Sequence, residues 1–372
     1  MMETHRSSDG SRGNRVSPHS MQFKRKRTII PLVIALAVFL AMGFALYLRA
    51  KAPPEAARLL PECDAMAYVK LKTLRAATHF DSAAVVRSPY FQQFIDATGI
   101  VPERDLDEVA LAMHRVPTPG PHKHGDPVAE IYTSEVFVGR FDGQRLAKYL
   151  AASASSHENY AGVDIYTVPV DGESLRVAQL GYDIIAISNM PQAEQIHSMV
   201  DRSRASGLSS PGSSLLAAHY GDVPQLPLPA QAWGIGHIGL PFSQNGYISV
   251  MGLQLPLPED TDLVASLRYS GSLHLRVEEM APDAEAAQRT VETLTTLLNI
   301  LRALGSEQLQ AQPSHDPAAA AMHDILASAN IVQHGKRAEL DATASGEDLK
   351  ALNAAHHPTP DVSSAPAGAS KH

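Results

Sequence analysis

The sequence contains a single cysteine, Cys63, among 372 residues, so it can form no intramolecular disulfide. A lone thiol without an evident partner is more typical of a small buried hydrophobic residue than of a nucleophile. The sequence also lacks the G-x-S-x-G and S-x-x-K motifs, so the familiar acyl-transfer nucleophiles have no local signature. An enzyme is not excluded, because the members of a catalytic triad need no fixed spacing.

Charged side chains are absent from residues 28–48. A helix over this stretch would be about 30 Å long, the thickness of the hydrocarbon core of a bilayer. Backbone amides in lipid find no water, so such a segment has to form a helix. The sequence therefore predicts a transmembrane helix over residues 28–48, with the lipid bilayer as its partner.

The flanking cations predict the orientation of this helix. Three cations follow it closely, whereas seven precede it: Arg6, Arg12, Arg15, Lys24, Arg25, Lys26 and Arg27. The positive-inside bias keeps a basic tail, residues 1–27, in the cytoplasm. Residues 52–372 are then periplasmic and anchored in the inner membrane. The alternative is a signal peptide cleaved after Ala50-Lys51-Ala52. The protein would then still be exported, but it would not be anchored in the membrane.

Small residues recur on one face of the predicted span, at Ala37, Ala41 and Ala45. Such a face allows two helices to approach closely, so a homodimer is one hypothesis. The other is that alanine is simply common here, since the glycine form of the motif is absent.

The part after the span is acidic. Residues 1–51 take nine of the 31 Lys and Arg and two of the 39 Asp and Glu, which leaves residues 52–372 with a formal charge of −15. Such a surface repels phosphate backbones and anionic headgroups. We therefore expect no nucleic acid as a partner.

Short strands and helices alternate along the rest of the chain. This pattern predicts an α+β fold with two similar lobes, residues 59–204 and 213–353, each a mainly antiparallel sheet covered on one side by helices. The longest soluble helix opens at Asp283, and we expect its apolar stripe to pack on the sheet of its own lobe. Residues 354–372 lack apolar periodicity and are expected to be a disordered tail.

Several segments resemble an uncharacterised family of bacterial single-pass envelope proteins. The resemblance lies in Leu59 to Val69, Val138 to Asp142, Tyr160 to Tyr166 and Ala186 to Ser188. It would cover most of residues 59–352. It implies a membrane-anchored envelope location and an α+β architecture, and it supplies no catalytic or binding residues.

The best metal candidate is a loop that carries His122, His124 and Asp126, with His114 at the end of the preceding strand. A stable zinc site needs three or four ligands supported by further contacts. A proline-rich loop supplies little support, so a solvated loop is the competing interpretation.

No cofactor is expected. Gly234, Gly236 and Gly239 match the dinucleotide spacing, but Pro241 follows and no helix can start there to receive a pyrophosphate. We expect these glycines to lie within a strand that another backbone approaches closely.

The pentapeptide Gln-Leu-Pro-Leu-Pro occurs twice, at residues 225–229 and 254–258. Such segments favour polyproline II, whose preset shape suits docking to an aromatic groove. A partner or ligand site is therefore predicted at Leu226, Leu228, Trp233, Leu255 and Leu257. The alternative is that these side chains cover one end of the sheet.

Together these features predict a membrane-tethered extracytoplasmic binding or scaffold protein of the cell envelope, without catalysis, whose partner is an envelope protein or an apolar ligand. The alternative function is a periplasmic hydrolase with an unrecognised active site. A purely structural envelope tether is a third hypothesis.

Overall fold

The computed structural model describes residues 38–43, 52–82, 85, 87–118, 129–205, 212–225, 228–237, 247–250, 253–256, 261–311 and 317–356. The chain divides into two compact units, Met1–Ala52 and Pro53–His372. In the first unit residues 38–43 are helical, and the rest of the predicted span, with Ala37 and Ala45, lies outside the described residues. Of the helices that are described, none is both long and apolar enough to cross a membrane.

The second unit contains one large antiparallel sheet and a separate hairpin, β9–β10. Strands of the first half are β1 (Ala65–Val69), β2 (Leu106–Pro117), β3 (Ala129–Gly139), β4 (Ser156–Tyr160), β5 (Val163–Val170), β6 (Glu173–Gln179) and β7 (Ile184–Ser188). Strands of the second half are β8 (Ala232–His237), β9 (Tyr247–Val250), β10 (Leu253–Pro256), β11 (Asp262–Tyr269), β12 (Ser272–Met280), β13 (Asn330–His334) and β14 (Arg337–Ser345).

Helices precede, interrupt and follow these strands. Those of the first half are α2 (Glu55–Leu59), α3 (Leu71–Thr78), α4 (Pro89–Thr98), α5 (Pro102–Asp105), α6 (Gly143–Ser153) and α7 (Glu194–Arg204), with a 3₁₀ turn η1 (Phe80–Ser82). Those of the second half are α8 (Ser214–His219), α9 (Ala284–Ala311), α10 (Pro317–Ser328) and α11 (Gly346–His356), with a 3₁₀ turn η2 (Tyr220–Asp222).

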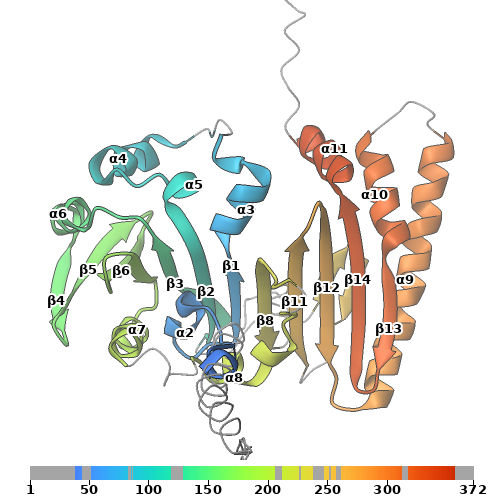
Figure 1. Cartoon of the computed structure of the whole chain (residues 1–372), viewed down its shortest axis with the longest axis horizontal. Helices are drawn as coiled ribbons and strands as arrows, with labels where there is room; N and C mark the ends of the chain where they lie inside the picture. Colours follow the sequence, from blue (N-terminus) through green and yellow to red (C-terminus); the bar gives the residue numbers. More distant parts are fainter. Residues whose placement is uncertain are drawn as a thin grey trace, which may run out of the picture. The chain divides into compact units, whose positions relative to one another are not determined.

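The large sheet has 12 described strands in the order β13-β14-β12-β11-β8-β1-β2-β3-β7-β6-β5-β4. The two halves meet at β1 and β8, which pair antiparallel from Ala65↔Gly236 to Val69↔Ala232 and lie side by side in the middle of the sheet (Figure 1). The α+β class and the antiparallel sheet predicted from the sequence are confirmed.

Both halves share one order of elements once the inserted segments are set aside, which are α3 to α5 and β4 to β6 in the first half and β9, β10 and β13 in the second. A short helix leads into three antiparallel strands, a helical segment follows, and the last strand returns beside the third one. In the first half these are α2, then β1, β2 and β3, then α6, with β7 returning beside β3. In the second half they are α8, then β8, β11 and β12, then α9 and α10, with β14 returning beside β12.

Helices pack on both faces of the first half. Alternate residues of β7 point to opposite faces, so Ile184 and Ala186 join one apolar cluster and Ile185 and Ile187 join another. On the first face, called here the α7 face, lie α2 and α7; on the other lie α4 and α6. The expectation that helices cover only one side is therefore wrong for this half.

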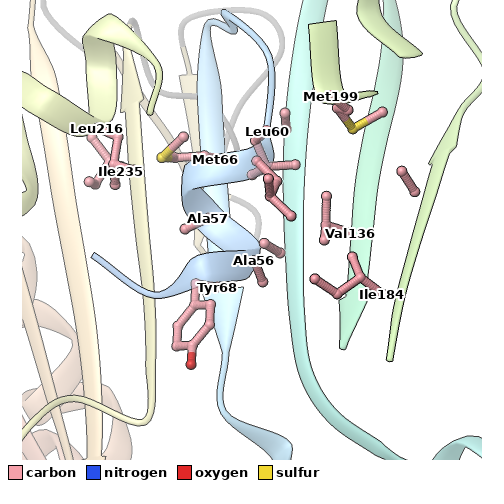
Figure 2. Close-up of a cluster of buried hydrophobic side chains, with 14 of the residues drawn as sticks. Ala56, Ala57, Leu60, Met66, Tyr68, Val136, Ile184, Met199, Leu216 and Ile235 are labelled. Atoms are coloured by element: carbon pink, nitrogen blue, oxygen red, sulfur yellow. The ribbon is translucent and has the colours of Figure 1, made fainter. Parts of the chain in front are cut away.

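The larger cluster belongs to both halves of the sheet. Figure 2 shows Met66 and Tyr68 of β1 between Ile235 of β8 and Val136 of β3, with α2 lying over them. Leu60, Met66, Ile235 and Val136 have no exposed surface. A shared core of this kind holds the β1–β8 junction together, because burying each such side chain contributes about 1.5–3 kcal/mol.

In the second half α9 and α10 contact β14, and α9 also contacts β13 (Figure 1). Ala287, Leu298 and Leu301 of the predicted apolar stripe are buried on α9. The prediction that this helix packs on its own half is confirmed.

Residues with capping side chains, Ser88, Asp142 and Ser345, lead the sequence to predict three helix starts. Ser88, Asp142 and Ser345 cap α4, α6 and α11, and the Ser345 amide also donates to Asp348 Oδ2 at 2.7 Å. Proline is favoured at the first position of a helix, so the sequence predicts a helix from Pro191 to Arg204. This helix, α7, instead begins at Glu194. Arg176 explains the delay, because its guanidinium binds the carbonyls of Met190 and Pro191, which then cannot accept the hydrogen bonds of a first helical turn.

Candidate binding site

A cavity of about 760 Å³, called here the β3–β6 pocket, opens on the α7 face. Its lining comes from the start of β3, from β4, β5 and β6, and from the segment between β7 and α7. The polar residues that line it are Glu130, Tyr132, Ser156, Thr167, Glu173, Ser174, Arg176 and Asn189. Concave sites with a few convergent polar groups are the usual form of small-ligand sites.

Arg176 forms one wall of the pocket. Its side chain leaves β6 on the α7 face, opposite Ser188 of β7. Nη1 donates to the carbonyl of Met190, and Nη2 donates to the carbonyl of Pro191 at 2.8 Å. The guanidinium therefore fixes the wall before α7, with those two nitrogens already engaged.

Two carboxylates line the mouth of the pocket. Glu130 and Glu173 are both exposed. The Tyr132 hydroxyl donates to Glu130, and this hydrogen bond raises the pKa of Tyr132. Asn189 Nδ2 donates to Glu173 Oε2 at 3.1 Å. Asn189 is itself held by the Thr133 amide, which donates to Asn189 Oδ1 at 2.6 Å.

Behind the pocket a buried chain of hydrogen bonds leads into the core. Ser188 Oγ lies 3.0 Å from Ser134 Oγ, which lies 2.9 Å from His114 Nε2. Burial lowers the pKa of His114, although the Asp64 carboxylate opposes that effect. None of the surface of Ser134 is exposed, so this Ser–His pair is closed to a substrate.

A second cavity, of about 540 Å³, lies along α7. The rings of Tyr160 and His197 stack there with centroids 3.9 Å apart. His197 Nε2 is 2.9 Å from Glu158 Oε1, and the Tyr160 hydroxyl donates to Asp201 at 3.0 Å. A carboxylate beside an imidazole is the arrangement that orients a general base.

The second half of the α7 face is strongly polar. Asp262 of β11 accepts from two imidazoles, His237 Nδ1 at 2.7 Å and His219 Nε2 at 3.0 Å. Arg337 bridges Asp222 and Glu278, at 2.7 and 3.1 Å. These pairs tie α8 and η2 to the sheet.

The predicted metal residues His122, His124 and Asp126 lie outside the described residues. His114 is bound to Ser134 within the core, at 2.9 Å. Among the residues that are described, no group of three or more His, Cys, Asp or Glu is placed to hold a metal ion. The loop site stays a prediction.

The predicted apolar site is only partly described. Leu226 and Leu257 lie outside the described residues, and Leu255 is in β10 with an undescribed side chain. Leu228 is 52% exposed. Trp233 is 5% exposed and stacks on Tyr68 with ring centroids 5.4 Å apart, so it belongs to the core. Gly234 lies within β8, close to the carbonyl of Met66, as its motif context suggested.

The residues of the β3–β6 pocket were not found from the sequence. Glu130, Glu173 and Asn189 are far apart in the chain and no motif links them. The one available signal is the spacing of Glu130 and Tyr132, which places both on one face of a strand.

Cys63 lies beside Ser213 and packs against the shared core. Desolvation raises the pKa of its thiol to about 12. The interpretation of Cys63 as a small hydrophobic residue agrees with this placement.

The fold and the site thus define an α+β protein with a pocket on one face of an antiparallel sheet. No protein-family model matches the chain, and no curated protein matches it. This agrees with the resemblance to a family without an assigned function. Two solved structures, crystal forms I and IV of TP0453, are similar with a TM-score of 0.40 and 11% and 10% identity. They cover 82% and 81% of this chain, and 98% and 97% of theirs.

Proposed function

We propose that this chain is a membrane-tethered, extracytoplasmic binding and scaffold protein of the cell envelope, and that the β3–β6 pocket holds its ligand or partner without catalysis. The observation that carries the proposal is the pocket itself. Its walls come from four strands of one sheet and from a segment pinned by Arg176, at 2.8 Å from the carbonyl of Pro191. A preformed site on rigid elements binds without a large ordering cost.

The membrane tether is supported by the uncharged stretch 28–48 and its basic flank. A reporter enzyme that works only outside the cytoplasm, fused after Lys371, tests the orientation. We expect activity outside. Reporter activity only inside the cell would contradict the envelope role. A mature protein whose mass lacks residues 1–52 would show that the segment is a cleaved signal peptide and not an anchor.

A homodimer through Ala37, Ala41 and Ala45 belongs to the same proposal. Replacing the three alanines by leucine should abolish cross-linking of the isolated span. A span that is monomeric before any replacement would remove the dimer and leave the tether in place.

The two-lobe division, residues 59–204 and 213–353, is proposed as a duplication. Its support is the shared order of elements around the β1–β8 pair. Because the larger apolar cluster contains residues of both halves, we expect the two to unfold in one cooperative transition.

The binding role is tested by filling the pocket. Ser156 and Ser174 are exposed and line it, so Ser156→Trp and Ser174→Trp should block entry. We expect a partner captured by the native full-length protein from solubilised envelope to be lost with either variant. Ala303→Trp, on an exposed position of α9, is the matched control and should retain the partner. Equal capture by all variants would refute the pocket as the site.

The second candidate function, an extracytoplasmic hydrolase, is favoured by His197, which lines the cavity along α7 and lies 2.9 Å from the carboxylate of Glu158. A generic chromogenic ester tests it. If the protein is a hydrolase, turnover should fall at least about 100-fold in His197→Ala, the usual contribution of a general base. Turnover equal in both proteins would end this alternative.

A further inference from the structure

We infer that the β3–β6 pocket takes a cationic ligand that carries primary ammonium groups, such as a lysine-bearing peptide segment or a polyamine. The inference rests on the proposed function only in using the same pocket as the binding site. It adds the chemical class of the ligand, which neither the fold nor the sequence motifs supply.

The first argument is the local balance of charge. Glu130 and Glu173 bring two carboxylates to the pocket, against one guanidinium from Arg176. Arg176 Nη1 and Nη2 already donate to the carbonyls of Met190 and Pro191. These carbonyls are neutral, so the guanidinium keeps its charge and the lining has a net formal charge of −1. Because two of the guanidinium nitrogens are engaged in the wall, the carboxylates supply most of the free charged contacts that a ligand meets.

The second argument is the balance of donors and acceptors. Glu130 accepts from the Tyr132 hydroxyl, and Glu173 accepts from the Asn189 amide, which are both neutral donors. An ionised carboxylate has about four lone-pair positions, so each keeps room for further donors. An ammonium group offers three donors and no acceptor, and its bonds to carboxylate are charge-assisted.

The third argument concerns the neutral part of the lining. Tyr132 is half-buried in the wall, and an aromatic face attracts a cation within about 6 Å. Ile131, Met190 and Pro191 also line the pocket and suit the methylene stem of a lysine or polyamine. The site therefore matches both ends of such a ligand.

The fourth argument is independent of the pocket. Residues 52–372 carry a formal charge of −15, which raises the local concentration of cations and repels anions. The net charge of the protein and the lining of the pocket thus both favour a positively charged ligand.

The test uses the full-length protein in a neutral detergent and isothermal titration with trilysine and spermidine. Triglycine and triglutamate are the uncharged and anionic probes. We expect trilysine or spermidine to bind at least tenfold more tightly than triglycine, and triglutamate not to bind. The tighter of the two cationic probes identifies a peptide or a polyamine as the source of the ammonium groups.

The decisive variant is Glu130→Gln with Glu173→Gln, which removes two negative charges and keeps the shape. Both residues are exposed, so the variant should melt like the native protein. We expect its affinity for the cationic probe to fall at least about tenfold, the worth of one charge-assisted hydrogen bond. The control is Glu292→Gln with Glu347→Gln, two exposed positions on α9 and α11, and should change affinity less than twofold.

The inference is overturned if neither cationic probe binds, or if the pocket variant and the control variant lose affinity equally, which would indicate unspecific attraction to an acidic surface. Binding of triglycine that Ser174→Trp abolishes, without preference for cations, would refute the ligand class and leave the pocket as a binding site. If Ser174→Trp binds the probes as tightly as the native protein does, the pocket is not the binding site, and the proposed function fails separately from the ligand class.

Discussion

His114 and Ser134 face each other from neighbouring strands, with His114 Nε2 2.9 Å from Ser134 Oγ. In an exposed cleft this pair would suggest a nucleophile and its base. Here Ser134 has no exposed surface and its hydroxyl continues to Ser188 Oγ, 3.0 Å away. The pair therefore stabilises the packing of β2, β3 and β7, and the first predictions concern its energetic role.

Ser134→Ala should lower the free energy of unfolding by about 1–3 kcal/mol, because His114 and Ser188 each lose a hydrogen bond to the Ser134 hydroxyl inside the core. Urea denaturation measures this loss as a lower midpoint at an unchanged slope. Ser174→Ala, at an exposed position, is the control and should change stability by less than about 0.5 kcal/mol. A loss at Ser134 as small as that of the control would contradict a structural role.

Stability should fall as the pH drops below about 6.5, the ordinary pKa of histidine. Burial lowers the pKa of His114 in the folded protein, so between the two pKa values the unfolded chain binds more protons. The contribution is therefore present above the unfolded pKa and is lost as the pH falls towards the folded one. Urea unfolding from pH 7.5 to pH 5 should show a steeper decline for the native protein than for His114→Gln. Parallel curves would exclude His114 as the cause.

Glu279→Gln should stabilise the protein at pH 7 by about 1 kcal/mol or more, because it removes a charge from an apolar site. Glu279 is 5% exposed under α9, where the Thr290 hydroxyl is its one polar neighbour among the described residues and only partly offsets the burial of the carboxylate. Burial raises its pKa, so the native protein should gain stability on acidification through this group, and the variant should lack that gain. Glu285→Gln, on an exposed position of the same helix, should have little effect. A destabilised Glu279→Gln protein would mean that the carboxylate has a stabilising partner.

Cys63 should resist alkylation and disulfide exchange in the folded protein up to about pH 9, because only the thiolate reacts. Burial raises the pKa of this thiol to about 12. Thiol titration should show almost no reaction in native buffer and one reactive group per chain in urea. Rapid reaction in native buffer would show that Cys63 is accessible and ionised.

Short-range sequence signals correctly predicted the helix starts at which they act. The capping residues Ser88, Asp142 and Ser345 marked three helix starts, because a cap is a contact between residues two or three positions apart. Helices α2 and α8 are not predicted, although Ser213 caps α8, because their five and six residues hold too few apolar positions for a period to show. Strand β4 was missed because its sequence, Ser-His-Glu-Asn-Tyr, is polar at an edge of the sheet.

The sequence by itself determined the uncharged stretch 28–48, the acidic remainder and the α+β alternation, since each depends on composition or on contacts between near neighbours. Only the tertiary structure decided that β1 and β8 join two halves into one sheet, that helices cover both faces of the first half, and that Glu130, Glu173 and Arg176 meet in one pocket. The physical reason is that strand pairing and pocket formation depend on contacts between residues far apart in the chain. No local propensity encodes which strand a given strand will choose.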